Sequence, residues 1–409
     1  MRLLDDNPTD EDLLGFSAHA DLLFQVITGT TRLPLTVGIF GSWGSGKTSL
    51  MRTVEAKLRH EKVKTVWFNA WKYDGKEAIW NALIQTIFYE MKSDPDVARS
   101  SRRAAFRRRV VRASKELAKY SAKVGTRFVP GGIVREEDVD AVLEALGSSA
   151  DDRLFEFVNK FEFMFDSLVK DYVGEKGFLV VFIDDLDRCL PENAIEVMEA
   201  LKLYLDRANC IFVLGVEPTI VEEAIKRRYN DSASLSATEY IEKIIQIPFV
   251  LPRPRTDMLL ALSSASGATA VPKQSKRMGT LIRAGTNRNP RRVKRFLNAF
   301  TLAAQTDGGR LSREEKLSLA KVLLIQMRFP RFYGALVDDP GLITKVSGKP
   351  ESAWEDAGVG ELREDVRLVQ FLSQTSDVAA QVEDVRRWIR AAVPAEPASE
   401  VDANEVDAN

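Results

Sequence analysis

The chain has 409 residues, of which 45% are hydrophobic, and its formal net charge is -1. This near-neutral charge argues against electrostatic binding of nucleic acid or a membrane surface through the net charge of the protein. A local charged patch can still bind either. The two cysteines have no second cysteine pair to complete a zinc site, and the two histidines leave little material for a metal site or a histidine-based hydrolytic triad. Two lone cysteines, both expected to be buried, fit a reducing compartment. No stretch approaches the roughly 18 uninterrupted apolar residues of a spanning helix, and the acidic N-terminus lacks a signal peptide, so we expect a cytoplasmic protein.

The first predicted elements alternate between strand and helix. Residues 34–50 begin with an apolar strand, continue into a glycine-rich loop and end at the start of a helix. A second strand is expected at residues 63–69, where β-branched and aromatic side chains dominate. Apolar side chains recur at spacings of four within residues 76–92, which predicts a helix after this strand.

A basic segment follows, and its charge separates it from the rest of the chain. Residues 92–135 contain 13 Lys or Arg against three acids, a net charge of +10. We expect a helical insert over about 93–150, with the arginines gathered at 99–127. Six of them are too closely spaced to face inward together: Arg102, Arg103, Arg107, Arg108, Arg109 and Arg112. The sequence leaves open a solvated helix face, binding to nucleic acid phosphates, and contact with an acidic partner, a neighbouring subunit or anionic lipid.

The alternation of helix and strand resumes after the insert. An amphipathic helix is predicted at 153–173 and a continuous apolar strand at 178–184. A further helix (191–206) and another buried strand (210–216) follow. Strands that are apolar on both faces and alternate with helices are typical of a parallel sheet. We therefore expect an α/β fold built on a parallel sheet.

The remainder of the chain is expected to be mostly helical. From about residue 219 the pattern is helical, with a Pro-bounded break at 248–257 and a new helix near Pro290. Residues 311–392 also have a helical pattern. Residues 393–409 are acidic, poor in apolar groups and contain a tandem EVDAN repeat, which predicts disorder.

The glycine-rich loop carries the pattern G-x-x-x-x-G-K-[ST]. Its glycines let backbone N–H groups point at phosphate oxygens, and the helix that begins near Lys47 adds a dipole that favours negative charge. Lys47 is expected to reach the outer phosphates of ATP, and the Thr48 hydroxyl to coordinate Mg²⁺. The alternative, an ordinary glycine-rich turn, is disfavoured by the strand before the loop and the helix after it. Nucleotide contacts are predicted for Gly41, Ser42, Trp43, Gly44, Ser45, Gly46, Lys47, Thr48 and Ser49.

Two carboxylates end the apolar strand at 178–184. The first, Asp184, is predicted to hold Mg²⁺, since a strand-end carboxylate does so in nucleotide sites of this kind. The second, Asp185, is predicted to orient or deprotonate the attacking water. The alternative is that both merely begin a polar loop, where Asp is common.

Several blocks of sequence, in order, resemble the KAP family of P-loop NTPases. The resemblance covers about residues 10–300 and rests on DLLGF (12–16), GIFGSWGSGKTSL (38–50), WFNAWKYDG (67–75), VVFIDDLDRC (180–189), YIEKIIQIPFVLP (240–252) and NPRRVKRFLN (289–298). It implies an additional-strand ATPase core, in which a strand lies between the two phosphate-binding motifs, followed by a helical lid. It also supports the assignment of Asp185 to the water.

The resemblance implies catalytic roles for two arginines. Arg188 matches the family's D-D-h-D-R block, where it contacts nucleotide or a neighbouring subunit, or instead forms an internal ion pair with Asp187 or another acid. Arg291 matches a lid arginine that reaches the terminal phosphate. Arg292 and Arg295 compete for that role, and an exposed basic helix face is the alternative.

Two further positions are less well matched to the family. Glu217 stands where family members often carry a shorter Asp as a sensor of the terminal phosphate. Residues 68–71, the FNAW block, are expected to pack at the sheet edge rather than to take part in chemistry. Many family members also insert membrane helices between the two motifs, whereas here this stretch is the arginine-rich insert, which is too charged to span a bilayer.

Together these patterns predict four regions and an ATP-hydrolysing function. The regions are a P-loop core (1–218) with the insert, a helical lid (219–310), a C-terminal helical region (311–392) and the disordered tail (393–409). We expect a Mg²⁺-dependent ATPase that acts as a switch or assembly ATPase, as a homo-oligomer or with a separate effector protein, in prokaryotic defence against phage or mobile elements. The alternatives are a non-hydrolysing, nucleotide-bound scaffold, an adaptor for nucleic acid or protein, and a small-molecule kinase.

Overall fold

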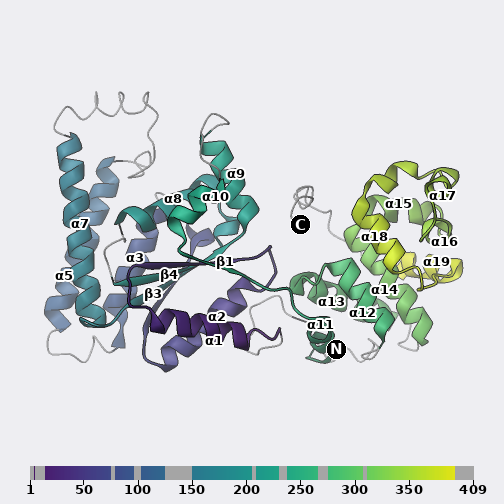
Figure 1. The fold of residues 1–409 in the computed structure, drawn as a ribbon, viewed down its shortest axis with the longest axis horizontal. Coiled ribbons are helices and arrows are strands. Elements are labelled where there is room, and N and C mark those ends of the chain that lie inside the picture. Colours follow the sequence, from purple (N-terminus) through teal and green to yellow (C-terminus); the bar gives the residue numbers. More distant parts are fainter. Residues whose placement is uncertain are drawn as a thin grey trace. The chain divides into compact units, whose positions relative to one another are not determined.

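The computed structural model describes residues 4, 14–74, 79–95, 103–124, 150–204, 209–229, 237–265, 275–306 and 311–391. The chain forms two compact units, one of residues 16–251 and one that combines residues 1–15 with residues 252–409 (Figure 1). The predicted tail (393–409) and the parts of the predicted insert at 96–102 and 125–149 lie outside the described residues. Each unit is described below by itself.

The first unit is built on a parallel five-stranded sheet. Its strands are β1 (Leu35–Phe40), β2 (Lys64–Asn69), β3 (Leu179–Asp184), β4 (Cys210–Val216) and β5 (Ile247–Val250). They are arranged in the order β2-β3-β4-β1-β5, and every neighbouring pair is parallel. Every residue of β1, β3 and β4 is buried, which accounts for their continuous apolar sequences. Strand β4 separates β1 from β3, so the predicted additional-strand α/β core is confirmed.

Helices cover both faces of this sheet. They are α1 (Ser17–Gly29), α2 (Lys47–His60), α3 (Ile79–Ser93), α5 (Arg103–Val124), α7 (Ala150–Val173), α8 (Pro191–Tyr204), α9 (Pro218–Tyr229) and α10 (Ala237–Ile244). Helices α1 and α2 lie on one side of the strands and α3 and α8 on the other (Figure 1). Both cysteines are free and buried, as expected.

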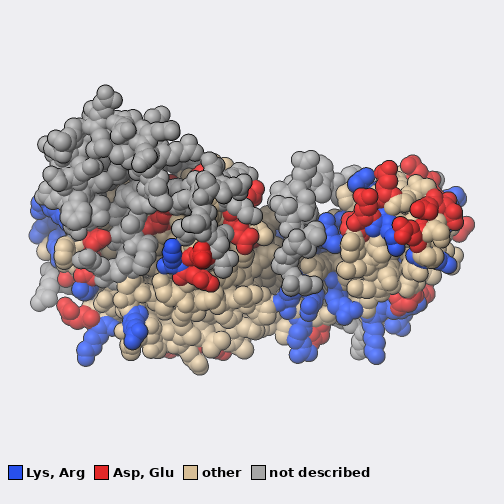
Figure 2. Space-filling model, turned by 45° about the horizontal axis from the view of Figure 1, so that its top comes forward, with Lys and Arg blue, Asp and Glu red and all other residues tan. Residues whose placement is uncertain are grey.

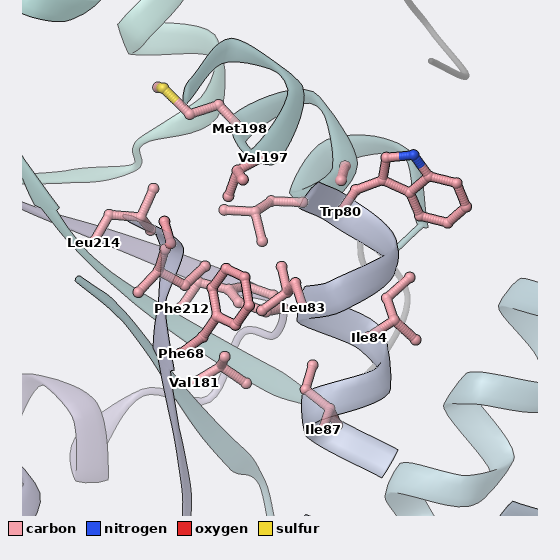
Figure 3. Close-up of a cluster of buried hydrophobic side chains, with 14 of the residues drawn as sticks. Phe68, Trp80, Leu83, Ile84, Ile87, Val181, Val197, Met198, Phe212 and Leu214 are labelled. Atoms are coloured by element: carbon pink, nitrogen blue, oxygen red, sulfur yellow. The ribbon is translucent and has the colours of Figure 1, made fainter. Parts of the chain in front are cut away.

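The main hydrophobic core lies between the sheet and α3. This helix turns Leu83 and Ile87 toward the sheet, at the spacing of one helical face, and buries Ile84 on its other side. Figure 3 shows Leu83 beside Phe68 of β2 and Phe212 of β4, together with residues of α8. Because this core fixes the strand ends, it also fixes the polar side chains that follow them.

The structure adds a strand that the sequence analysis did not predict. β5 occupies the start of the stretch that was expected to be a Pro-bounded break between helices, and it pairs with β1. Pro248 has no N–H to donate, and such a residue is tolerated here because β5 is the edge strand of the sheet. Helices α9 and α10 and strand β5 lie with the sheet in residues 16–251. The predicted division of the chain at residues 218 and 310 stays a prediction.

The described part of the basic insert is helical, as predicted. Helix α5 contacts α3 and α7, and it buries Val110, Ala113 and Leu117 against the core of the first unit. Arg108 and Arg112 lie on its exposed side. Among the described residues, no helix is long and apolar enough to cross a membrane.

The second unit is helical. Its helices are α11 (Thr256–Ala265), α12 (Lys276–Thr286), α13 (Pro290–Thr306), α14 (Arg313–Arg328), α15 (Pro330–Asp338), α16 (Leu342–Val346), α17 (Glu351–Asp356), α18 (Val366–Gln374) and α19 (Val382–Ala391). Helix α14 is central: it contacts α12, α13, α15 and α19, and it begins at a capping box between Ser312 and Glu315. Leu4 exchanges two hydrogen bonds with the Asn298 side chain, which join Leu4 to this unit. Figure 2 shows acidic side chains gathered toward the end that carries α15, α16 and α17, and basic ones along the lower edge.

Candidate active site

Polar side chains gather at the carboxyl end of the sheet in the first unit. The glycine-rich loop follows β1, Asn69 ends β2, and Asp184 and Asp185 end β3. In a parallel sheet these strand ends share one edge, where ligands of open α/β folds bind. The sheet therefore brings together residues that are far apart in the sequence.

The glycine-rich loop has the shape that its sequence predicts. Gly44 and Gly46 have φ values of 76° and 107°, a left-handed region that favours glycine. A Cβ on Gly41 would lie 2.6 Å from Ser45 Oγ, so a side chain there requires the loop to shift. Helix α2 begins directly after Gly46, so its free N–H groups face the loop. Trp43 lies in the loop with 53% of its surface exposed.

Lys47 is held inside the site by its own loop and by an acid. Its Nζ donates to the carbonyl oxygen of Gly41 at 2.7 Å and to that of Ser42 at 3.4 Å. It also forms an ion pair with Asp187 Oδ2 at 2.8 Å, in which both side chains are almost fully buried. From the sequence, Asp187 was expected only as a possible ion-pair partner of Arg188. To reach a phosphate, the ammonium group must exchange at least one of these contacts.

Asp184 and Thr48 meet as the sequence predicts for a metal site. Thr48 Oγ1 donates to Asp184 Oδ1 at 3.1 Å, and Asp184 is only 4% exposed. Burial, and after it the neighbouring charge of Asp185, raise the pKa of Asp184 to about 6. Gly215 of β4 lies close by, since a Cβ there would be 3.3 Å from Asp184 Oδ1.

This oxygen pair fits Mg²⁺. Within the part of the chain that the structure describes, Asp184 forms no ion pair, and no three His, Cys, Asp or Glu side chains group as a metal cage. Mg²⁺ is commonly bound through one or two protein oxygens with waters and substrate phosphates rather than by an all-protein cage. A buried carboxylate beside a hydroxyl, without a cation, is the kind of partial ligand set that such a metal completes.

Asp185 points to other partners. Its Oδ2 accepts a hydrogen bond from Asn69 Nδ2 at 2.6 Å, and its Oδ1 lies 2.9 Å from Arg188 Nε. The residue has φ of 57°, which turns the chain after β3. The Arg188 guanidinium lies 5.3 Å from the centre of the Trp71 ring. The structure thus shows Arg188 in an internal ion pair with an acid, which was one of its two predicted alternatives.

Sequence reasoning missed Asn69 as a member of the site. The FNAW block was expected to pack at the sheet edge, and Phe68 and Ala70 are indeed buried. Asn69 lies between them and turns its amide to Asp185 instead. The signal in the sequence is a polar amide at the carboxyl end of a predicted parallel strand, the same signal that identified Asp184 and Asp185.

Two further predicted positions are Glu217 and Arg291. Glu217 follows β4, and its carbonyl oxygen accepts the N–H of Ile220 at the start of α9. Arg291 belongs to the second unit, in the first turn of α13, where its N–H donates to Asn289 Oδ1 at 3.1 Å. Its assignment to the terminal phosphate stays a prediction.

One protein-family model matches most of the chain. Residues 16–306 match the model of the KAP family P-loop domain. The chain belongs to the KAP family. The phage T7 exclusion protein of Escherichia coli K12 is 23% identical over 256 residues, which are 60% of this chain and 34% of that protein. The KAP chain described here therefore spans about a third of the length of this relative.

Two solved structures are similar at low identity. A Walker-type ATPase of Pyrococcus abyssi is 14% identical, with a TM-score of 0.38, over 95% of this chain and 99% of that one. The Cdc6p protein of Pyrobaculum aerophilum is 12% identical, with a TM-score of 0.43, over 95% and 98% of the two chains. At such values neither likeness informs the activity of this KAP protein.

Proposed function

We propose that this KAP family protein binds ATP with Mg²⁺ and hydrolyses it as a nucleotide-driven switch. The observation that supports this best is the convergence of Lys47, Thr48, Asp184 and Asp185 at one edge of the sheet. A phosphate loop alone supports binding only. The second acid, Asp185, adds a group that can act on water.

The phosphates would be held by the loop and the start of α2. Backbone N–H groups of the loop and of the start of α2 would face the β- and γ-phosphate oxygens, and the helix dipole favours their charge. Lys47 leaves Asp187 and donates to these oxygens. Thr48 and Asp184 hold Mg²⁺, which when bound neutralises charge that develops on the phosphates.

Hydrolysis requires one water molecule and one proton acceptor. The water oxygen forms a bond to the γ-phosphorus while the bond from that phosphorus to the β,γ-bridging oxygen breaks. ADP leaves with the bond's electron pair, and the water proton passes to the Asp185 carboxylate and then to solvent. In this proposal Arg291 stabilises the charge on the terminal phosphate. Arg188 does the same after it leaves Asp185, in its own site or in that of a neighbouring subunit.

The switch is proposed to control a partner. Ordering around the γ-phosphate and its loss on hydrolysis is a general way to couple nucleotide to partner contacts. Because a relative is a phage exclusion protein, we propose that the partner is an effector in defence against phage or mobile elements. The chain acts as a homo-oligomer or with that separate effector. Nucleic acid is a second candidate partner, favoured by the exposed Arg108 and Arg112 on α5.

The first experiment measures Mg²⁺-dependent ATP hydrolysis and ATP binding side by side. We expect Asp185→Asn to lose hydrolysis by at least about a hundredfold while it keeps ATP binding. Lys47→Ala is expected to lose binding. ATP bound tightly without hydrolysis in the unmodified protein, alone and with DNA or RNA added, would favour the scaffold. Hydrolysis retained by Asp185→Asn would refute the assigned water.

A further inference from the structure

The order of the strands sends the two neighbouring aspartates in opposite directions. Asp184 bonds to Thr48, which follows the phosphate loop of β1, and it lies near Gly215 of β4. Asp185 bonds to Asn69, at the end of β2. Because the order is β2-β3-β4-β1, β2 lies on the side of β3 away from the phosphate loop. The Asp185 carboxylate, which must act on water, is therefore held on the side of β3 away from the phosphate loop.

Both oxygens of the Asp185 carboxylate are engaged there. Asn69 Nδ2 donates to Oδ2 at 2.6 Å, and Arg188 Nε lies 2.9 Å from Oδ1. The Asn69 hydrogen bond is made to a charged group and is therefore stronger than a neutral one, and the Arg188 contact is an ion pair, so the two together hold the side chain. Only 17% of the Asp185 side chain is exposed, which limits competition by solvent.

Asn69 is itself fixed in place. Its Oδ1 accepts the N–H of Lys72 at 3.2 Å and so caps η1 (Ala70–Tyr73). The amide oxygen of Asn69 therefore binds the turn, and its amide nitrogen binds Asp185. Trp71, on this turn, lies beneath the guanidinium of Arg188. Both groups that hold Asp185 are thus tied to η1.

We propose that Asn69 is a positioning residue that restrains Asp185 in the resting protein, so that hydrolysis requires the carboxylate to leave the Asn69 amide. This inference rests on the proposed ATPase function and adds a regulatory step to it. The resting site binds ATP at full strength but turns it over slowly. A change at η1 that moves Asn69 frees the acid.

The experiment replaces Asn69 by serine. A serine hydroxyl can still cap η1, as serine does at helix starts, but it is too short to reach Asp185. We expect Asn69→Ser to raise kcat for Mg²⁺-ATP about tenfold, with KM changed by less than about twofold, since only the restraint on the acid is lost. The double variant Asn69→Ser with Asp185→Asn is expected to be inactive, which would show that the gain acts through Asp185.

A matched control uses a second Asn–Asp pair near the site. Asn193 Nδ2 donates to Asp74 Oδ1 at 2.6 Å and does not contact Asp185. Asn193→Ala removes an amide of the same kind and is expected to leave kcat unchanged. Equal gains in both variants would indicate general loosening of the site and overturn the inference.

The remaining outcomes separate this inference from the proposed function. A kcat that falls in Asn69→Ser, in a protein whose hydrolysis depends on Asp185, would mean that Asn69 holds the acid productively and would overturn only the inference. If the unmodified protein binds ATP without turnover, we expect Asn69→Ser to start turnover. Continued inactivity with ATP bound would count against the restraint. Loss of the Lys47 and Asp185 dependence itself would refute the proposed function instead.

Discussion

The carboxylate of Asp184 is 4% exposed, and Thr48 is its side-chain hydrogen-bond partner. Its pKa is raised to about 6 from 3.8 by burial. The folded protein therefore binds this proton more tightly than the unfolded chain, so the stability it contributes is present below about pH 4 and lost as pH rises through 6. At neutral pH the ionised group costs the nucleotide-free fold up to about 3 kcal/mol.

Asp184→Asn is expected to make the nucleotide-free protein more stable at pH 7, by about 1–3 kcal/mol, and unable to hydrolyse ATP. Thermal unfolding of the variant and the unmodified protein at pH 7 and pH 5 measures this. The difference should shrink at pH 5, where Asp184 is largely protonated in the folded protein. A variant that is less stable at pH 7 would contradict the view that ionised Asp184 destabilises the fold when no metal is bound.

Lys321, at the centre of the second unit, supplies a pH test of the opposite sign. It is 1% exposed, donates to the carbonyl oxygens of Thr375 and Val378, and burial lowers its pKa to about 8 from 10.5. The unfolded chain binds this proton more tightly, so stability rises as pH increases from about 8 to 10. Relative to Lys321→Met, the unmodified protein should gain about 2–3 kcal/mol over this interval. If the free energies of unfolding of the two proteins changed in parallel with pH, a lowered pKa of Lys321 would be excluded.

At the residue scale, the sequence predicts groups better than their pairings. Lys47, Thr48, Asp184 and Asp185 were identifiable because a local pattern and a strand end specify each of them. The partners Asp187 for Lys47 and Asn69 for Asp185 were not, since each pairing joins residues more than a hundred positions apart. Such contacts depend on strand order and side-chain packing, which one-dimensional patterns do not contain.

Among the elements, α12 and α14 pack closely enough to require a glycine. A Cβ on Gly285 would lie 2.8 Å from both terminal carbons of Leu324. We expect Gly285→Ala to destabilise the protein by about 1–3 kcal/mol through overpacking. Gly334 on α15 is the matched control, because a Cβ there meets nothing within 4 Å. Gly334→Ala should be stabilising by about 0.5–1 kcal/mol, as alanine is the better helix former. Denaturant unfolding measures both, and equal effects would refute the packing argument.

Helix α5 has an arginine that is structural and others that are available to a partner. Arg109 is paired with Asp171 and Ser167 of α7, so changing it disturbs the fold. If α5 binds nucleic acid, Arg108→Glu with Arg112→Glu should weaken that binding and flatten its salt dependence by about two phosphate contacts. The control Arg331→Glu with Arg386→Glu changes total charge equally at exposed sites of the second unit. Unchanged binding of labelled DNA and RNA would indicate a solvated face.

Elements with a strong period were predictable, and a short edge strand was not. Apolar residues recur at helical spacing in α3, which specifies a helix. The continuous apolar segments of β3 and β4 specify buried strands. Strand β5 is four residues long, contains Pro248 and has no period long enough to recognise. It exists because the exposed edge of β1 is available to pair with it.

On the scale of the whole molecule, the chain comprises two compact units with separate cores. We expect calorimetry to show two transitions. Mg²⁺-ATP at about a hundred times its Kd should stabilise the unit of residues 16–251 by roughly 2.7 kcal/mol. Gly285→Ala should lower the other transition, which assigns the two. Lys47→Ala should abolish the shift caused by ATP, and a single transition that moves with both changes would refute independent units.

The contact of Leu4 with the second unit shows what the sequence could not reveal at this scale. Leu4 and Asn298 are 294 positions apart and exchange two hydrogen bonds. The KAP motifs indicate the order of the parts along the chain, and the fold class follows from them. They carry no information about which distant segments close a unit.

The ion pair between Lys47 and Asp187 makes the Asp187 carboxylate a competitor of phosphate for the lysine. The carboxylate is tethered beside the lysine at a high effective concentration, so any anion must displace it before it can use that charge. We expect a lone inorganic phosphate to do so poorly, whereas a nucleotide with three phosphates offers enough new contacts to compensate for the broken pair. The site would then select for the length of the phosphate chain before any base is recognised, and Asp187 would act as a threshold that short anions do not pass.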